Sequence, residues 1–277
     1  MLPFLFIKKQ VIYILNHKCY NLYGDSMNQF SRLEILVGND NVEKIKNTSV
    51  LIIGLGGVGS FALESLVRNG VGNVVIVDAD TVDITNLNRQ LMTCHGNIGS
   101  YKTDVWEERI HSINPDCKVT KITDFITSEN ISLLFSWKID YIIDACDTIS
   151  VKKELIRESK KRGIKLISAM GTGFKMDPSR LKITDVSKTS YDPIAAIIRK
   201  MVRDEKIKGK VMVVSSDEQP IKSSSKTIGS ACIVPSVAGL LCASYVINDI
   251  LRWENEKWIA KNYKIILRKY FYVRYYR

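Results

Sequence analysis

The stretch from residue 50 to residue 80 has the residue types and spacing of a phosphate-binding turn. Four apolar residues, 50–53, run directly into GLGGVGS, which contains Gly54, Gly56, Gly57 and Gly59. The first glycine permits a sharp turn, the middle two let a phosphate approach backbone N–H groups, and the last permits close helix packing. An amphipathic run, 60–69, follows and predicts a helix whose N-terminus attracts an anion. We interpret the stretch as a nucleotide site; the alternative is a purely structural strand–turn–helix unit.

Acidic, amide and cationic side chains follow this turn at the expected strand ends. Asp78 comes directly after a second apolar run, 74–77, where a carboxylate can accept hydrogen bonds from ribose hydroxyls. The further candidates are Asp80, Asn86, Asn88, Arg89, Lys102, Asp144 and Asp147. Two cations would neutralise phosphate charge and an acid would hold a magnesium ion. The set favours ATP with Mg²⁺ over a nicotinamide dinucleotide, although Arg89 or Lys102 taken singly is equally typical of a solvated surface charge.

The elements that must position these side chains alternate between strands and helices. Strands are predicted at 50–53, 74–77, 117–125, 141–143 and 165–169, and helices at 60–69, 101–113 and 151–162. This alternation predicts an α/β fold with a Rossmann-like, doubly wound, mostly parallel sheet and helices on both faces. All the candidate side chains would then meet at the carboxyl edge of the sheet, where ligands bind.

The pattern changes after Gly173. We predict an edge strand at 181–189, a helix from Pro193 to about Lys206, a strand at 210–218, a polar loop at 219–230 and an apolar-faced helix at 235–253. With no repeat and no clean linker, residues 27–253 form one predicted domain. Residues 1–26 are an extension that need not be native, and residues 254–277 are a basic aromatic tail.

The charge, the cysteines and the apolar runs of the sequence indicate the kind of partner and the cellular location to expect. The 277 residues carry a formal net charge of +11, part of it in the last 26 residues. This excess indicates either a polyanionic partner such as RNA or simply a lysine-rich composition. The six cysteines form no CxxC pair, so we expect no structural zinc site and a reducing, cytoplasmic location. No apolar run is expected to span a bilayer, although the hydrophobic first 15 residues allow peripheral membrane association.

These motifs together resemble the ThiF-type adenylating superfamily, which includes ubiquitin-activating and molybdopterin-synthase adenylylating enzymes. The resemblance rests on GLGGVGS, DAD at 78–80, NLNRQ at 86–90, Lys102 and DACD at 144–147, and it extends from about Phe30 to Leu251. It implies that Gly57 and Asp78 contact the adenosine and that Asp147 is the magnesium-linked acid. It further implies that Asn86, Arg89 and Lys102 handle phosphates, and that Arg32 reaches the ATP of the partner subunit in a homodimer.

Within the superfamily the chain is most similar to the tRNA threonylcarbamoyladenosine dehydratases of the TcdA type. The segments 113–119, 183–203 and 213–220 carry this likeness. It implies ATP-driven activation of the threonyl carboxylate and cyclisation on a tRNA substrate, and some relatives have sulfur-transfer or cysteine-desulfurase partners. The alternative is an adenylyltransferase that activates the C-terminus of a ubiquitin-like sulfur-carrier protein. A nicotinamide-dependent oxidoreductase is a third hypothesis.

Two further groups of residues have open roles. Cys232 precedes a predicted helix, where a thiol pKa can fall, but its neighbours look buried and a catalytic role is the weaker interpretation. A set of cations is compatible with tRNA phosphate contacts or with a solvated helix face. These are Lys175, Arg199, Lys200, Arg203, Lys206, Lys208 and Lys210.

Overall fold

The computed structural model describes residues 5–7, 10–15, 18–21, 27–225 and 227–251. Seven strands of this part form one sheet, in the order β6-β5-β4-β7-β8-β10-β9. They are β4 (Ser49–Ile53), β5 (Asn73–Val77), β6 (Lys118–Ile122), β7 (Tyr141–Asp144), β8 (Lys165–Ala169), β9 (Leu181–Asp185) and β10 (Met212–Ser216). Only β9 runs antiparallel to its neighbour, β10. The predicted mostly parallel, doubly wound sheet is confirmed.

The chain reverses its direction of travel across the sheet at β4. It moves from β4 to β5 and β6, then returns to the other side of β4 to form β7. All five residues of β4 are buried, because helices cover both of its faces. Such a switch point opens a crevice at the carboxyl ends of the strands, which is where ligands bind in open α/β sheets.

Alternate residues of β4 enter two separate cores. Val50 and Ile52 face the layer of α3 (Gly59–Arg68), α4 (Lys102–Ile113) and the helix Ile233–Leu251. Leu51 and Ile53 face the layer of α5 (Ile149–Arg162) and α6 (Pro193–Asp204). Successive side chains of β4 point to opposite faces of the sheet, and helices cover both faces, as predicted. Two short helices, α1 (Ser31–Val37) and α2 (Asn39–Lys46), precede β4.

The helix Ile233–Leu251 packs against this sheet, as its apolar face predicted. Val234, Ala238, Cys242 and Val246 of this helix are fully buried. Among the described residues it is the one helix long and apolar enough to cross a membrane by length and composition, whereas the sequence analysis expected no run of that length. Its buried residues belong to the core, so packing accounts for its apolar character.

The N-terminal residues contain a second, small sheet. Strands β1 (Leu5–Ile7), β2 (Gln10–Leu15) and β3 (Lys18–Asn21) pair antiparallel in the order β1-β2-β3. None of these strands was predicted. The division into an extension, one domain and a tail stays a prediction, and the tail at 254–277 lies outside the described residues.

Candidate functional site

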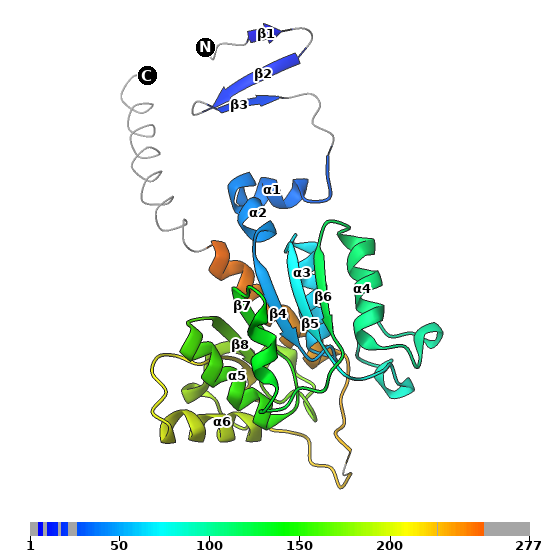
Figure 1. The fold of residues 1–277 in the computed structure, drawn as a ribbon, viewed down its shortest axis with the longest axis vertical. Coiled ribbons are helices and arrows are strands. Elements are labelled where there is room, and N and C mark those ends of the chain that lie inside the picture. Colours follow the sequence, from blue (N-terminus) through cyan, green and yellow to red (C-terminus); the bar gives the residue numbers. More distant parts are fainter. Residues whose placement is uncertain (1–4, 8–9, 16–17, 22–26, 226, 252–277) are drawn as a thin grey trace.

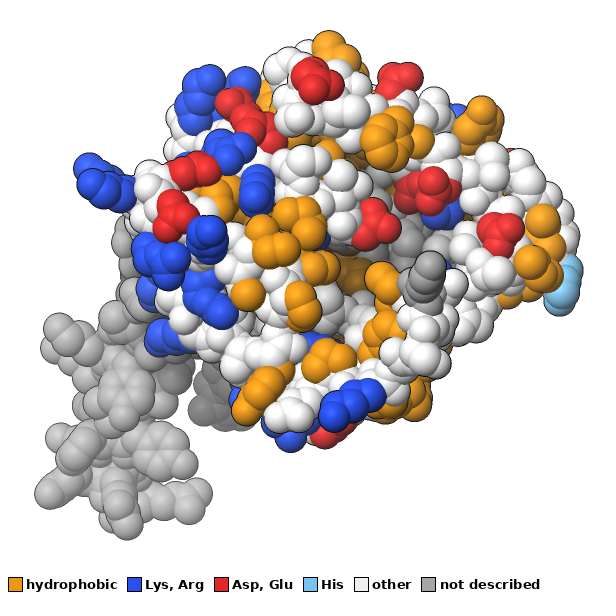
Figure 2. Space-filling model, turned by 90° about the horizontal axis from the view of Figure 1, so that it is seen from below, with side chains coloured by type: hydrophobic (Ala, Val, Ile, Leu, Met, Phe, Trp, Pro, Cys, Tyr) orange, Lys and Arg blue, Asp and Glu red, His pale blue; other side chains and the backbone are white. Residues whose placement is uncertain are grey.

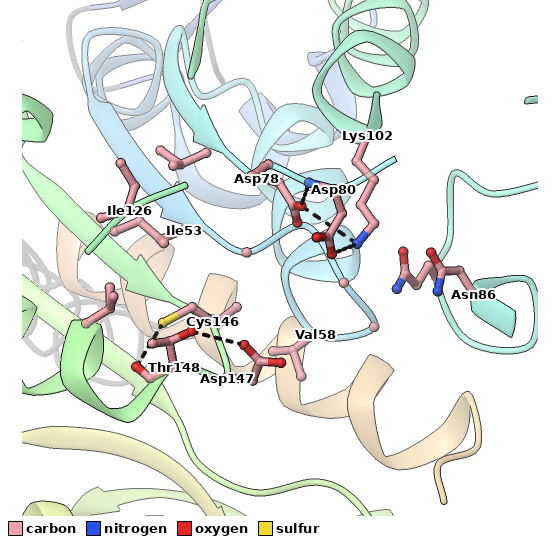
Figure 3. Close-up of a pocket in the computed structure, with 18 of the residues that line it drawn as sticks. Ile53, Val58, Asp78, Asp80, Asn86, Lys102, Ile126, Cys146, Asp147 and Thr148 are labelled. Atoms are coloured by element: carbon pink, nitrogen blue, oxygen red, sulfur yellow. Dashed lines mark hydrogen bonds and ion pairs between the residues drawn. The ribbon is translucent and has the colours of Figure 1, made fainter. Parts of the chain in front are cut away.

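A pocket of about 350 Å³ lies at the carboxyl ends of β4, β5, β6 and β7. Nine of the thirteen predicted site residues line it (Figure 3). They are Gly54, Gly56, Gly57, Asp78, Asp80, Asn86, Arg89, Lys102 and Asp147. The structure does not bring Gly59, Asn88, Asp144 or Arg32 to the pocket wall. Residues scattered over 94 positions of the sequence therefore meet at one edge of the sheet.

The glycine turn has no room for side chains at its two ends. Gly54 has φ +85°, a left-handed conformation that favours glycine, and a Cβ there would lie 2.7 Å from the carbonyl oxygen of Ala145. A Cβ on Gly59 would lie 1.8 Å from the carbonyl oxygen of Gly54. Gly59 thus shapes the turn from behind rather than lining the pocket. At Val58, the residue before α3, no side chain caps the helix, which suits an anion at this end.

Asp78, Asp80 and Lys102 form a connected group on one wall. The Lys102 Nζ lies 2.7 Å from Asp80 Oδ2 and 3.7 Å from Asp78 Oδ1, and its side chain is only 5% exposed. The Asp78 carboxylate accepts the backbone N–H groups of Leu55 (2.6 Å) and Asp80 (2.9 Å). Burial raises the pKa of Asp78, and the Lys102 charge and these two hydrogen bonds oppose that rise. Asp78 therefore ties the glycine turn to the end of β5.

Arg89 presents a less neutralised charge than Lys102 does. Its Nη1 donates to the carbonyl oxygen of Thr85 (2.7 Å) and to Asn88 Oδ1 (3.0 Å), and it has no salt bridge to an acid in the described part of the chain. Asn86 completes a capping box with Asp83 and is buried beside it. The arrangement leaves the guanidinium free to meet an anionic ligand in the pocket.

Asn88 and Asp144 have positioning contacts instead of pocket-lining ones. Asn88 Nδ2 donates to the carbonyl oxygen of Ser230 (2.9 Å), and Ser230 itself lines the pocket. Asp144 is fully buried, where its Oδ1 accepts from Lys152 Nζ (3.1 Å) and from the Cys146 N–H (3.3 Å). The sequence analysis expected Asp144 to contact the ligand. Its carboxylate is instead taken up by the core, and it anchors the loop that carries Asp147.

The acid that remains at the end of β7 is Asp147. It is exposed, it lines the pocket, and Thr148 Oγ1 contacts its Oδ1 at 3.4 Å. No group of three or more His, Cys, Asp or Glu side chains among the described residues could hold a metal ion. A magnesium ion would therefore need the oxygens of a bound phosphate as well as Asp147, and Mg²⁺ is often held in that way.

Two cysteines near the site differ in environment. Cys146 lines the pocket, and burial and the neighbouring Asp144 carboxylate raise the pKa of its thiol well above the usual range. Cys232 is exposed and is not among the residues that line the pocket. The site therefore offers no activated thiol at its wall.

The sequence analysis missed Asp124, Phe125 and Ile126, which line the pocket after β6. It extended that strand to residue 125, whereas β6 ends at Ile122. Ligand-binding side chains were expected directly after the carboxyl end of each strand. With the end of β6 placed at Ile122, the same expectation would have included these three residues. It also missed Thr172 and Ser230, which come from segments without a strand-end motif.

Arg32 lies on α1, which precedes β4 and sits at the amino edge of the sheet, opposite the pocket (Figure 1). Its side chain is exposed. Within one subunit it cannot take part in the site.

Comparison with known proteins agrees with this geometry. The ThiF family pattern matches residues 30–272. A Bacillus subtilis protein named tRNA threonylcarbamoyladenosine dehydratase is 44% identical over 243 residues, which cover 82% of this chain and 96% of that protein. The structure of the Escherichia coli tRNA N6-threonylcarbamoyladenosine dehydratase, TcdA, in complex with ATP is similar with a TM-score of 0.77 and 33% identity. That match covers 82% of this chain and 96% of TcdA.

A more distant similarity connects the chain to enzymes that act on other substrates. A molybdopterin-synthase adenylyltransferase of Haemophilus influenzae is 30% identical over 154 residues, which cover 56% of this chain and 60% of that protein. The likeness to the dehydratases is both stronger and more extensive.

Proposed function

The chain belongs to the ThiF family, and we propose that it catalyses the ATP-dependent dehydration of threonylcarbamoyladenosine beside the anticodon of tRNA. The observation that carries this is the match to the ATP-bound dehydratase structure, which covers 96% of that chain and 82% of this one. The Bacillus subtilis protein of the same name is 44% identical to it.

The chemistry requires activation of a poor electrophile. A carboxylate oxygen of the threonyl group attacks a phosphorus of ATP and a P–O bond of ATP breaks. ADP leaves if an acyl phosphate forms, and pyrophosphate leaves if an adenylate forms. An internal nitrogen or oxygen of the same nucleoside then attacks the acyl carbon. The activated oxygen leaves with the phosphate group and the attacking atom loses its proton, so the nucleoside loses one water. The attacking atom belongs to the substrate, which agrees with the raised pKa of the Cys146 thiol.

Each pocket residue has a proposed part in this reaction. Arg89 and Lys102 stabilise the negative charge that develops on the phosphates, and the α3 N-terminus contributes its dipole in the same direction. The Asp78 carboxylate accepts hydrogen bonds from the ribose hydroxyls of ATP. Asp147 would hold a magnesium ion together with the phosphates, and the ion would supply further charge neutralisation there.

We also propose that the active form is a homodimer in which Arg32 of each subunit completes the partner's site. An Arg32→Ala subunit and an Arg89→Ala subunit should each be inactive alone, because each lacks one cation at every site. Their heterodimer should recover activity, up to about half of that of the wild type, since one of its two sites has both arginines. Activity of purified, differently tagged heterodimers measures this. Heterodimers that stay inactive would count against a shared site.

The consumption of ATP distinguishes this function from the activation of a carrier protein. We expect tRNA that carries threonylcarbamoyladenosine to stimulate ATP turnover, whereas the unmodified transcript of the same tRNA should not. Stimulation by a small protein ending in Gly-Gly, with none by the modified tRNA, would instead support the adenylyltransferase alternative. The cytoplasm is the proposed location, because that compartment contains the proposed substrate.

A further inference from the structure

One side of the molecule, formed by α5, α6 and the residues just after α6, is strongly basic. Residues 153–162 and 199–210 hold eleven Lys and Arg and only four Asp and Glu. The two stretches form one continuous surface, because Arg157 on α5 binds Glu205 just after α6 (2.6 and 2.9 Å) and Lys160 Nζ donates to the carbonyl oxygen of Lys210 (2.6 Å). Figure 2 shows Lys and Arg side chains gathered on this side of the molecule.

The four acids do not neutralise this surface. Glu154 and Glu205 bind Arg157, Glu158 binds Lys161 and Arg162, and Asp204 contacts Arg203. Five lysines remain exposed without a salt bridge to an acid in the described part of the chain. With Arg203 they define what we call the α5–α6 surface: Lys160, Lys200, Arg203, Lys206, Lys208 and Lys210.

The buried side of α6 fixes the direction of this charge. Ala195, Ile198 and Met201 pack into the core beneath the helix. Lys200 and Arg203, three residues apart, are exposed and therefore lie on the opposite, outward face. Their charges are available to an external partner.

The α5–α6 surface begins beside the pocket. Asp192 caps α6 by accepting the Ala195 N–H (2.9 Å), and its second oxygen accepts the Gly171 N–H (2.9 Å). The next residue, Thr172, lines the pocket. From that rim the 12 residues of α6 run for about 18 Å, at the usual rise of a helix. A polymer that enters the pocket at one point can therefore continue along the helix.

The pocket cannot itself attract a nucleic-acid backbone. It is lined by Asp78, Asp80, Asp124 and Asp147 but by only two cations, Arg89 and Lys102. Its formal charge repels phosphates other than those neutralised by a metal ion. An RNA whose base reacts there must obtain its backbone contacts from another surface.

We propose that the α5–α6 surface binds the phosphate backbone of the tRNA whose modified adenosine enters the pocket. The inference rests on the proposed function for the identity of the RNA. Lysine contacts to phosphates supply affinity and orientation without reading sequence, which suits an enzyme whose specificity resides in one modified base. Of the cations noted in the sequence, Lys175 and Arg199 do not belong to this surface. Lys175 is buried, it donates to the carbonyl oxygen of Ser216 (3.1 Å), and burial lowers its pKa. Arg199 is half-buried, and its Nη1 donates to the carbonyl oxygen of Thr189 (2.8 Å).

The test removes two lysines from the surface and two from elsewhere. In the first variant Lys200→Gln and Lys208→Gln are combined. The control combines Lys118→Gln and Lys121→Gln on β6, at the other end of the sheet order. Binding of tRNA carrying threonylcarbamoyladenosine is measured by fluorescence anisotropy over a series of salt concentrations. Steady-state dehydration by the same proteins gives KM for tRNA, KM for ATP and kcat.

The logarithm of the tRNA association constant decreases linearly with log salt, and for the first variant we expect this decrease to be shallower, by about 2 in the slope. We expect KM for tRNA to rise about tenfold, with kcat and KM for ATP unchanged. A third variant, with Lys200→Arg and Lys208→Arg, should restore both values because it keeps the charges. A first variant that matches the β6 control would overturn the proposal and leave the surface to a protein partner. A wild-type protein that performs no dehydration, but whose salt dependence of tRNA binding is still reduced in the first variant and not in the β6 control, would refute the proposed function and support the surface.

Discussion

An Arg89→Ala variant is expected to lose about 10²- to 10³-fold in kcat for ATP-dependent dehydration, with its fold intact. The size follows from removal of one preorganised group that stabilises charge in the transition state. Arg89 is the pocket cation without a salt bridge to an acid among the described residues, whereas the charge of Lys102 is shared with Asp78 and Asp80. Its present contacts, to Thr85 and Asn88, are with neutral groups on the surface.

The measurement is single-turnover dehydration at saturating ATP and tRNA, with circular dichroism as the check on folding. Arg68→Ala is the matched control, because Arg68 is a half-exposed arginine on α3 that binds Glu64 at the surface. The control should keep wild-type kcat. A folded Arg89→Ala enzyme with wild-type kcat would contradict the proposed role of Arg89 in the transition state. If only its KM were raised, Arg89 would contribute to ground-state binding alone.

A Lys152→Met variant is expected to lose about 3–5 kcal/mol of unfolding free energy, the cost of breaking a buried ion pair. Lys152 is 1% exposed, and its Nζ binds Asp144 Oδ1 (3.1 Å) and the carbonyl oxygen of Ala169 (2.8 Å). Burial lowers the pKa of Lys152, but the Asp144 charge, the hydrogen bond to Asp144 and the neighbouring Cys146 and Cys242 together outweigh burial and leave the pKa raised. Methionine fills the same space and leaves the Asp144 carboxylate without its cation.

Urea unfolding of wild type and variant measures this loss. Lys153→Met, one residue along and only partly buried, should change stability by no more than about 0.5 kcal/mol. Adding Asp144→Asn to Lys152→Met should recover part of the loss, because the unpaired charge is then gone. Equal losses for the two lysine variants would show that the pair does not stabilise the fold. The pKa of Lys152 is higher in the folded than in the unfolded protein, so the protonated side chain stabilises the fold fully at pH values below its unfolded-state pKa. This contribution should be lost as the pH rises through the folded-state pKa of Lys152.

Sequence reasoning predicted the fold well because the inner strands of this sheet, such as β4, β5 and β7, are short, apolar and almost wholly buried. Runs such as 50–53 and 74–77 lie within β4 and β5, which pair in register from Ser49 and Asn73 to Ile53 and Val77. The glycine turn was equally predictable from the sequence. The φ of +85° at Gly54 and the lack of space for a Cβ at Gly59 disfavour every residue other than glycine at these two positions.

The candidate site was less predictable, because a residue's place in the sequence does not show where its side chain points. Asp144 and Asp147 are three residues apart at the end of one strand, yet one is fully buried against Lys152 and the other is exposed in the pocket. Asp144 differs in its buried partners, Lys152 on α5 and Ser168 on β8, and their approach depends on packing between distant segments. Thr172 and Ser230 were missed for the same reason, since they reach the pocket through tertiary contacts.

The most direct test of the proposed function is mass spectrometry of nucleosides from tRNA that carries threonylcarbamoyladenosine, after incubation with the protein, ATP and magnesium. The account predicts an ATP-dependent loss of one water from that nucleoside and from no other. An unchanged nucleoside, with ATP binding demonstrated in the same preparation, would contradict it.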